Sequence, residues 1–582
     1  MFPSSTFHLV PKLQLGNKGK TSPRAAWLRA TTILTNTKVC DQKRRWLQIF
    51  CFLFPSSSLG TQLCRSSSFG GAVPKLELGN EGKDYFETLA SSLERQRVSA
   101  VAGGKLELPG QGVPKLELGN EGKVCDQKRK FSVLTKEKRM TPHRVSIVRY
   151  RTPGESVRRA VDLAGGLPPL KSGARVFIKP NIVFWTRAVP FPKWGVITTS
   201  RVMEDMVKLL KAHGVDDITI GEGIITADPR DRETPDHAFT TLGYGVLAKR
   251  YGVKTLNVMD DDFAPVEIGE GTTLNFCARA LESDLIVDLP VLKTHNQTVV
   301  TLGIKNLKGL IDIPSRKKCH RMDDEADLHA MVARLPDRLP AVFTVIDGIY
   351  SAERGPAFDG KMHRSDLLIA SADLLSADLV GARVLGHDPA DVPHLAYAAR
   401  NHGRPLDLSD IEVVGEPIEA VARFHAYDFD YAQDSDGNWL PVPLIKQGIR
   451  GLSYPKYDLT MCTYCSGING VVLSAIRYAW KGEPFDDVEV LTGKVMKPTP
   501  GKKKTILLGK CMYQAHKNNP DINEMIAVKG CPPKPEDILN ALHQAGIDAD
   551  PALFAGMDRF PGFFMARYQG KPEFDEAFFR VQ

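Results

Sequence analysis

The chain has 582 residues, of which 42% are hydrophobic and 25% are charged, and its formal net charge at pH 7 is +8. This composition is typical of globular proteins and excludes a largely disordered, collagen-like or coiled-coil chain. No run of about 18 apolar residues occurs, so a polytopic membrane protein is excluded and no membrane partner is expected.

The positive charge belongs to the first 139 residues. They contain 23 Lys and Arg against 11 Asp and Glu, a balance of +12, whereas residues 140–582 contain 53 against 57, a balance of −4. Proteins that bind nucleic acid usually present a basic face. The longer part of the chain therefore gives no electrostatic reason to expect a nucleic-acid partner.

Residues 1–139 repeat short words at irregular spacing. The word at 10–17 recurs with one substitution at 73–80 and 113–120, and the word at 38–44 recurs at 123–129. Repeats that stack into a solenoid need a fixed period. We therefore predict a largely unstructured tail, translated from a repetitive DNA element upstream of a true start at Met140. The alternative is a basic tail that binds an acidic partner.

From Met140 the pattern changes to strands that alternate with helices. Arg175–Ile178 is a short strand, Val202–Ala212 has the apolar spacing of a helix that stops at Gly214, and Asp217–Ile220 is the next strand. A helical stretch from Phe239 to Tyr251 follows, and further strands are expected at 255–258, 285–289 and 342–346. This alternation predicts an α/β domain over residues 140–440, with a mainly parallel sheet and helices on both faces.

Polar residues follow these strands, where ligands of open parallel sheets bind. Ammonium and amide groups donate hydrogen bonds to carboxylates and phosphates, so we expect five of these residues to bind a small anionic substrate. The five are Lys179, Asn181, Lys293, Lys305 and Asn306, with Lys308 close by in the same Gly303–Gly309 segment. The candidate catalytic residues, as acid–base groups or ligands of a divalent ion, are Glu222, His295 and Asp347.

Each of these residues taken alone is also explained by helix capping or surface solvation. The sequence has no glycine-rich dinucleotide fingerprint and no phosphate-loop motif. Neither class of nucleotide-binding motif is therefore supported.

Several of these segments occur in the order found in one family. They are Phe177–Asn181, Asp288–His295, Gly303–Gly309, Asp347–Ile349 with Gly355-Pro356, and Ala370–Asp373. In this order they resemble the domain-of-unknown-function 362 family, over roughly residues 145–386. Many members of that family also carry iron–sulfur motifs, but the resemblance implies a fold region more than a reaction.

The cysteines of the α/β domain and of the C-terminal segment differ in their pattern. Cys277 and Cys319 are isolated and are expected to be core residues. Cys462 and Cys465 form a C-x-x-C pair, which places both thiolates on one side of a turn. Two single cysteines follow, Cys511 after the strand-like run 506–508 and Cys531 before a helix predicted from Pro535 to Ala545.

We predict that Cys462, Cys465, Cys511 and Cys531 hold a [4Fe–4S] cluster in a smaller C-terminal α/β segment over residues 441–582. Residues 528–536 resemble the last cluster-ligand motif in the small cluster-bearing subunit of respiratory complex I, which implies similar ligand geometry. Zinc is an alternative, although zinc ribbons usually have two C-x-x-C pairs, and a redox pair without metal is another. His516 is expected to be a solvated helical residue and not a ligand.

Together these features predict an iron–sulfur redox protein of the oxidoreductase type. It would bind a small anionic substrate in the α/β domain and exchange electrons with a donor or acceptor protein. A chain without an export signal is expected to be cytoplasmic and to keep its thiols reduced. The alternative is a non-catalytic ligand-binding or carrier protein in which a four-cysteine metal site only stabilises the fold. Enzyme and carrier both stay open at this point.

Overall fold

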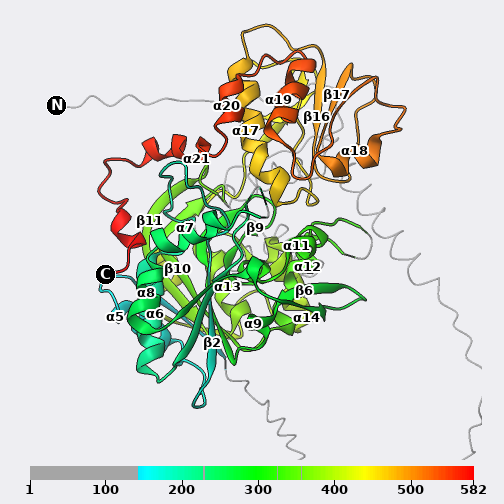
Figure 1. Ribbon diagram of the computed structural model, residues 1–582. Coiled ribbons are helices and arrows are strands. Elements are labelled where there is room, and N and C mark those ends of the chain that lie inside the picture. The colour runs from blue at the N-terminus through cyan, green and yellow to red at the C-terminus, as the bar shows by residue number, and fades with distance from the viewer. Residues whose placement is uncertain (1–141, 227, 229, 324–325, 356) are drawn as a thin grey trace, which may run out of the picture. The chain divides into compact units, whose positions relative to one another are not determined.

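The computed structural model describes residues 142–226, 228, 230–323, 326–355 and 357–582 (Figure 1). The tail predicted over residues 1–139 lies outside the described residues.

A ten-stranded sheet forms the centre of the larger part of the chain. Five neighbouring strands, β10, β7, β2, β3 and β4, are parallel, whereas β11 runs antiparallel to β10 and β1. The prediction of a mixed α/β fold with a mostly parallel central sheet is therefore confirmed. In spatial order the strands are β12 (Ile411–Gly415), β1 (His143–Arg149), β11 (Lys361–Ser371), β10 (Val342–Glu353), β7 (Leu285–Leu289), β2 (Arg175–Pro180), β3 (Asp217–Glu222) and β4 (Lys254–Asn257); β8 (Val291–His295) pairs with β10 and with β9 (Val299–Val300).

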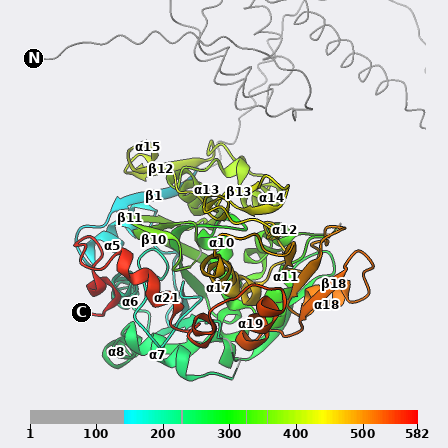
Figure 2. The same ribbon diagram turned by 90° about the horizontal axis from the view of Figure 1, so that it is seen from above.

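Apolar side chains alternate between the two faces of this sheet. Ile178 of β2 belongs to one core cluster and its neighbour Phe177 to another, because successive side chains of a strand point to opposite faces. The first cluster is covered by α5 (Glu155–Leu163), α6 (Ser200–Ala212), α7 (Glu233–Thr241) and α8 (Tyr244–Tyr251). The second is covered by α10 (Leu302–Asn306), α12 (Leu328–Ala333), α13 (Leu374–Val384) and α14 (Pro393–Asn401), so helices lie on both faces (Figure 2).

The helix predicted from Phe239 to Tyr251 is instead two helices, α7 and α8. Gly243 separates them, with a φ of 76° that a continuing right-handed helix does not allow. By contrast, α6 forms as predicted, because the Thr199 side chain caps its first turn and Gly214 follows its end with a φ of 78°.

A second sheet lies in the C-terminal part of the chain. Its four strands are parallel, in the order β15 (Leu452–Ser453), β16 (Val488–Leu491), β17 (Lys504–Leu508) and β18 (Glu524–Val528). Two helices, α17 (Thr463–Ala479) and α19 (Pro535–Gln544), share a buried core with these strands, and α19 confirms the helix predicted after Cys531. Within the described part of the chain, no helix combines the length and the apolar character needed to cross a membrane.

The last residues of the chain return to the larger sheet. Tyr568 and Phe579 are buried in the same core cluster as Trp194 and Tyr350, and the rings of Trp194 and Phe574 lie 5.4 Å apart. The C-terminal segment therefore covers one end of strands that precede it by more than two hundred residues.

Candidate functional site

A buried ion pair joins the carboxyl ends of β2 and β3. Lys179 Nζ lies 2.9 Å from Glu222 Oε1, and both side chains are 1% exposed. Lys179 also donates to the carbonyl of Pro180 at 2.6 Å, and the Ile182 amide donates to Glu222 Oε2 at 2.8 Å. Burial lowers the pKa of Lys179, and the nearby Glu222 carboxylate opposes that shift.

Amide side chains extend this pair into a network. Asn181 Nδ2 donates to Asn306 Oδ1 at 2.9 Å, and Lys293 Nζ donates to Asn181 Oδ1 at 2.7 Å. Asn306 Nδ2 in turn donates to Asp288 Oδ1 at 2.7 Å. The structure thus brings five predicted site residues into one hydrogen-bonded group: Lys179, Asn181, Glu222, Lys293 and Asn306.

Asp288 is the member of this network that the sequence analysis missed. Its carboxyl is fully buried, burial raises its pKa well above the usual range, and its Oδ2 has no hydrogen-bond partner among the described residues. The sequence does point to such a role, because Asp288 is the one acidic residue in the otherwise apolar strand Leu285–Leu289. A polar side chain in such a strand is expensive to bury unless it bonds to another polar group.

Asp347 lies outside this network. Its Oδ2 accepts hydrogen bonds from the amide and the hydroxyl of Thr199, at 2.7 and 2.8 Å, and its Oδ1 accepts from the Ile349 amide at 3.1 Å. Burial raises its pKa. Because Thr199 caps α6, the contacts of Asp347 fix the start of that helix and do not reach the predicted lysines.

A group of basic side chains lies beside the network. It consists of Lys293, His295, Lys305, Lys308 and His320, and we call it the cation cluster. His320 Nδ1 donates to the Leu459 carbonyl at 3.1 Å, which leaves Nε2 to accept from Lys308 Nζ at 2.6 Å. Lys305 Nζ has no hydrogen-bond or ion-pair partner among the described residues.

The cation cluster differs in its electrostatics from the Lys179–Glu222 ion pair. Burial lowers the pKa of Lys293 to about 7 and that of Lys308 to about 8. The pKa of His295 lies well below its usual value, first through burial and then through the charges of Lys305 and Lys308. No carboxylate is among the main causes of the pKa shifts of His295, Lys305 or His320. The cluster is therefore deficient in negative charge, and an anion would supply what it lacks.

The four predicted metal-binding cysteines come from three segments. Cys462 immediately precedes α17 and Cys465 lies in its first turn, Cys511 lies in α18 (Lys510–His516), and Cys531 lies between β18 and α19. The Cys462 and Cys465 thiols are hydrogen-bonded, which lowers the pKa of Cys462 to about 5. The charges of Cys462 and Cys531 both act on Cys511, and that of Cys511 acts on Cys465. The fold thus places the thiols of Cys462 and Cys465 in contact with each other.

Zinc and an iron–sulfur cluster need different arrangements of the four thiols. Among the described residues, no group of three or more His, Cys, Asp or Glu side chains is placed so that it could hold a metal ion. A zinc ion draws four ligands to about 2.3 Å from a single point, whereas an iron–sulfur cube binds one thiolate at each of four separate irons. The described residues form neither arrangement, so the choice between a cluster and zinc stays a prediction.

Basic residues surround these thiols and connect them to the cation cluster. Lys317 Nζ lies 3.4 Å from Cys531 Sγ, and Lys494 Nζ donates to the Lys317 carbonyl at 2.9 Å. The charge of Cys462 raises the pKa of Lys308 in the cation cluster. Gln297, just after β8, donates to the carbonyls of Asp458 and Met461 at 3.0 Å each, which fixes the loop before Cys462. The cysteines and the cation cluster are therefore neighbours.

The sequence analysis did not assign His320, Lys317 and Lys494 to the site. A signal existed in the basic run from Arg316 to Arg321, but only the fold brings it against the cysteines. The prediction of a solvated His516 is wrong, because its ring is 9% exposed and its Nε2 lies 2.7 Å from the Met496 carbonyl. The predictions for Cys277 and Cys319 are confirmed, since both are fully buried.

Part of the chain is similar in sequence to known proteins. Residues 176–383, from β2 to α13, match the model of a family described as a domain of unknown function (DUF362), which confirms the resemblance seen in the ordered motifs. The match contains the buried network and the cation cluster and ends before the cysteines. Over 271 residues, 46% of this chain and 80% of the relative, the sequence is 26% identical to a thylakoid-associated protein of Synechocystis sp..

Proposed function

We propose that this protein is an iron–sulfur redox protein of the oxidoreductase type, which binds a small carboxylate anion in the cation cluster next to a four-cysteine [4Fe–4S] site. The observation that carries the proposal is the position of Lys308, which is coupled electrostatically to His295 on one side and to Cys462 on the other. A bound anion would therefore lie beside the redox centre.

The case for an anion rests on uncompensated charge. A buried cation is costly unless it is paired, and Lys179 shows how this fold pairs one, with Glu222 at 2.9 Å. Lys305 has no such partner among the described residues, and Lys308 contacts a histidine. A dicarboxylate would accept hydrogen bonds from both ammonium groups and offset the repulsion within the cluster.

The case for the cluster rests on the thiols and their surroundings. Cys462, Cys465, Cys511 and Cys531 would hold it, and a bound [4Fe–4S] cluster passes one electron at a time. The hydrogen bond with Cys465 lowers the pKa of Cys462 to about 5, which favours the thiolate form that binds iron. Lys317 and Lys494 would offset the negative charge of four thiolates. Cys511 and Cys531 are exposed, so an electron donor or acceptor protein could approach from this side. The cytoplasmic location stays a prediction.

Metal analysis tests the redox site. Protein purified without oxygen is expected to contain iron and acid-labile sulfide in equal amounts, with a broad absorption band in the visible blue. Cys511→Ser should lose most of both, whereas Cys277→Ser should keep them, because Cys277 donates to Asp261 at 3.0 Å and a serine hydroxyl can do the same. Stoichiometric zinc without sulfide would refute the redox proposal and favour a carrier with a structural four-cysteine site.

Ligand binding tests the cation cluster. Oxalate and succinate are expected to raise the melting temperature of the wild-type protein. Lys305→Gln should weaken their binding about 10- to 100-fold, since a hydrogen bond to a charged group contributes about 1.5–3 kcal/mol. Lys249→Gln, on the exposed side of α8, is the matched control. Equal binding by Lys305→Gln and the control would contradict the proposed anion site.

A further inference from the structure

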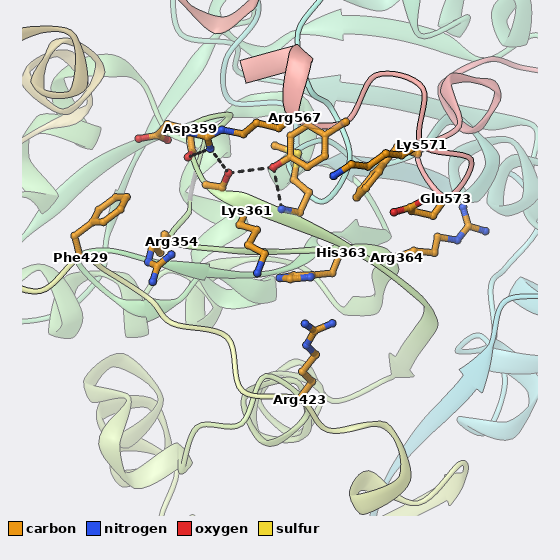
Figure 3. Close-up of a pocket in the computed structure, with 14 residues that line it drawn as sticks. Arg354, Asp359, Lys361, His363, Arg364, Arg423, Phe429, Arg567, Lys571 and Glu573 are labelled. Atoms are coloured by element: carbon orange, nitrogen blue, oxygen red, sulfur yellow. Dashed lines mark hydrogen bonds between the residues drawn. The ribbon is translucent and has the colours of Figure 1, made fainter. Parts of the chain in front are cut away.

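A separate cavity of about 760 Å³ opens where β10 ends and β11 begins (Figure 3). Its walls come from the loop between these two strands and the start of β11, from Arg423 and Phe429, and from the C-terminal segment 567–574. None of its residues belongs to the cation cluster or to the cysteine site. Six lining residues are basic and two are acidic: Arg354, Lys361, Arg364, Arg423, Arg567 and Lys571 against Asp359 and Glu573.

Two of these basic residues are firmly held and form fixed walls. Arg364 donates to Tyr350 Oη at 2.7 Å and stacks over the Phe578 ring at 4.2 Å. Arg567 donates to the carbonyls of Asp359 and Gly360, at 2.9 and 3.2 Å. These contacts fix both guanidinium groups in place at the cavity wall.

The other basic residues lack sufficient counter-charge. Glu353 is the ion-pair partner of two of them, at 3.8 Å from Lys361 and 4.0 Å from Arg354, and it also lies 3.8 Å from His363. The Arg423 side chain has no hydrogen-bond or ion-pair partner among the described residues, and Figure 3 shows its guanidinium facing Lys361 and His363.

Two buried nitrogen atoms of the lining are also unsatisfied. Arg354 Nε and His363 Nε2 have no hydrogen-bond partner among the described residues, and the His363 side chain is 9% exposed. Buried donors are rarely left without an acceptor, so both atoms point to a missing ligand. Guanidinium groups match the geometry of phosphate oxygens with paired donors, which favours phosphate as that ligand.

The cavity also has an aromatic side. Phe429, Tyr568 and Phe574 line it, and Arg354 lies over the Phe429 ring at 5.2 Å. Its volume falls within the range of about 300–1,000 Å³ that is typical of small-molecule sites. It therefore has room for a flat ring as well as for charged groups.

We propose that this cavity binds a nucleoside diphosphate. The phosphates lie between Arg423, Lys361 and Arg354, and the base packs against Phe429. The site uses side-chain cations in place of a glycine-rich loop, which is why no nucleotide motif appears in the sequence. The proposal does not depend on the cysteine site or the cation cluster, since no residue is shared.

Calorimetric titration with ADP, pyrophosphate and adenosine tests this proposal on the full chain. ADP is expected to bind, pyrophosphate to bind about tenfold more weakly, and adenosine to show no binding up to about 1 mM. Arg423→Gln should weaken ADP binding about 10- to 100-fold without unfolding the protein, because the Arg423 side chain has no partner to lose among the described residues. Arg400→Gln, on the surface of α14, is the matched control and should bind ADP as the wild type does.

A second variant tests the ring contact. Phe429→Leu should weaken ADP and leave pyrophosphate unchanged. Absence of ADP binding, or equal affinities of Arg423→Gln and Arg400→Gln, would overturn the site, and equal affinities of ADP and pyrophosphate would overturn the nucleoside. Lys305→Gln should leave ADP binding unchanged, which keeps the outcome separate from the test of the cation cluster.

Discussion

Replacing Glu222 by Gln removes the negative partner of a fully buried lysine while keeping the shape of the side chain. At an effective dielectric constant of about 20, two unit charges 2.9 Å apart attract by about 6 kcal/mol. Lys179 can limit the loss by giving up its proton, since burial already lowers its pKa. We therefore expect Glu222→Gln to lower the free energy of unfolding by about 3–5 kcal/mol at pH 7.

Urea unfolding followed by circular dichroism measures this change. The matched control is Glu282→Gln, whose partner Arg175 lies 3.3 Å away but whose side chain is 64% exposed, so the control should lose less than about 1 kcal/mol. The pH dependence gives a second check. Without Glu222, the folded protein favours neutral Lys179, whereas the unfolded chain keeps it charged up to a pKa of about 10.4. The unfolded variant then binds more protons, so the deficit of the variant should shrink as pH rises from 7 towards 10.

A loss below about 1 kcal/mol at pH 7, or a deficit that grows with pH, would refute this reasoning. The double variant Lys179→Met/Glu222→Gln adds a further condition. Because its two sites are in contact, its loss should be smaller than the sum of the two single losses by at least about 1 kcal/mol.

Three further predictions concern the same region. Gly309→Ala would place a methyl group 2.6 Å from Lys179 Cε and should cost about 1–3 kcal/mol in urea unfolding, whereas Gly245→Ala in α8, with nothing within 4 Å, should not destabilise; equal effects would contradict the close packing. Oxalate affinity should fall between pH 7 and 9, since Lys308, with a pKa of about 8, loses its proton over that range, and a flat calorimetric profile would exclude Lys308 from the site. Removing iron with a chelator should speed hydrogen exchange in α18 and leave α6 unchanged; unchanged exchange in α18 would argue against a cluster held by Cys511.

The sequence predicted the centre of the α/β fold well and its edges poorly. Strands such as β2 and β7 are buried on both faces, so they read as short continuous apolar runs between polar residues. The antiparallel strand β11 and its neighbour β1 were missed, because nothing local distinguishes a strand that reverses the direction of the sheet. The break at Gly243 was missed for a related reason, since the apolar spacing continues across it while the backbone does not.

The sequence predicted which residues form the candidate site better than it predicted how those residues are arranged. The rule that ligands bind beyond parallel strands brought together Lys179, Asn181, Lys293 and Glu222, which the fold does join. It could not show that Lys179 is neutralised by Glu222 while Lys305 is left unpaired, because pairing depends on distances between segments far apart in the chain. The basic cavity was missed altogether, since its residues are scattered from Arg354 to Phe574 and share no motif.

The return of the C-terminal segment onto the larger sheet has a thermodynamic consequence. Tyr568 donates to the Gly360 carbonyl at 3.2 Å and lines the basic cavity, so this wall exists only while the segment is docked. Whatever occupies the cavity must therefore favour the docked state, and docking must strengthen the occupant's affinity by the same factor. Proteolysis of the final twenty residues becomes a sensitive reporter of occupancy, and a bulky fusion at that end would compete with it.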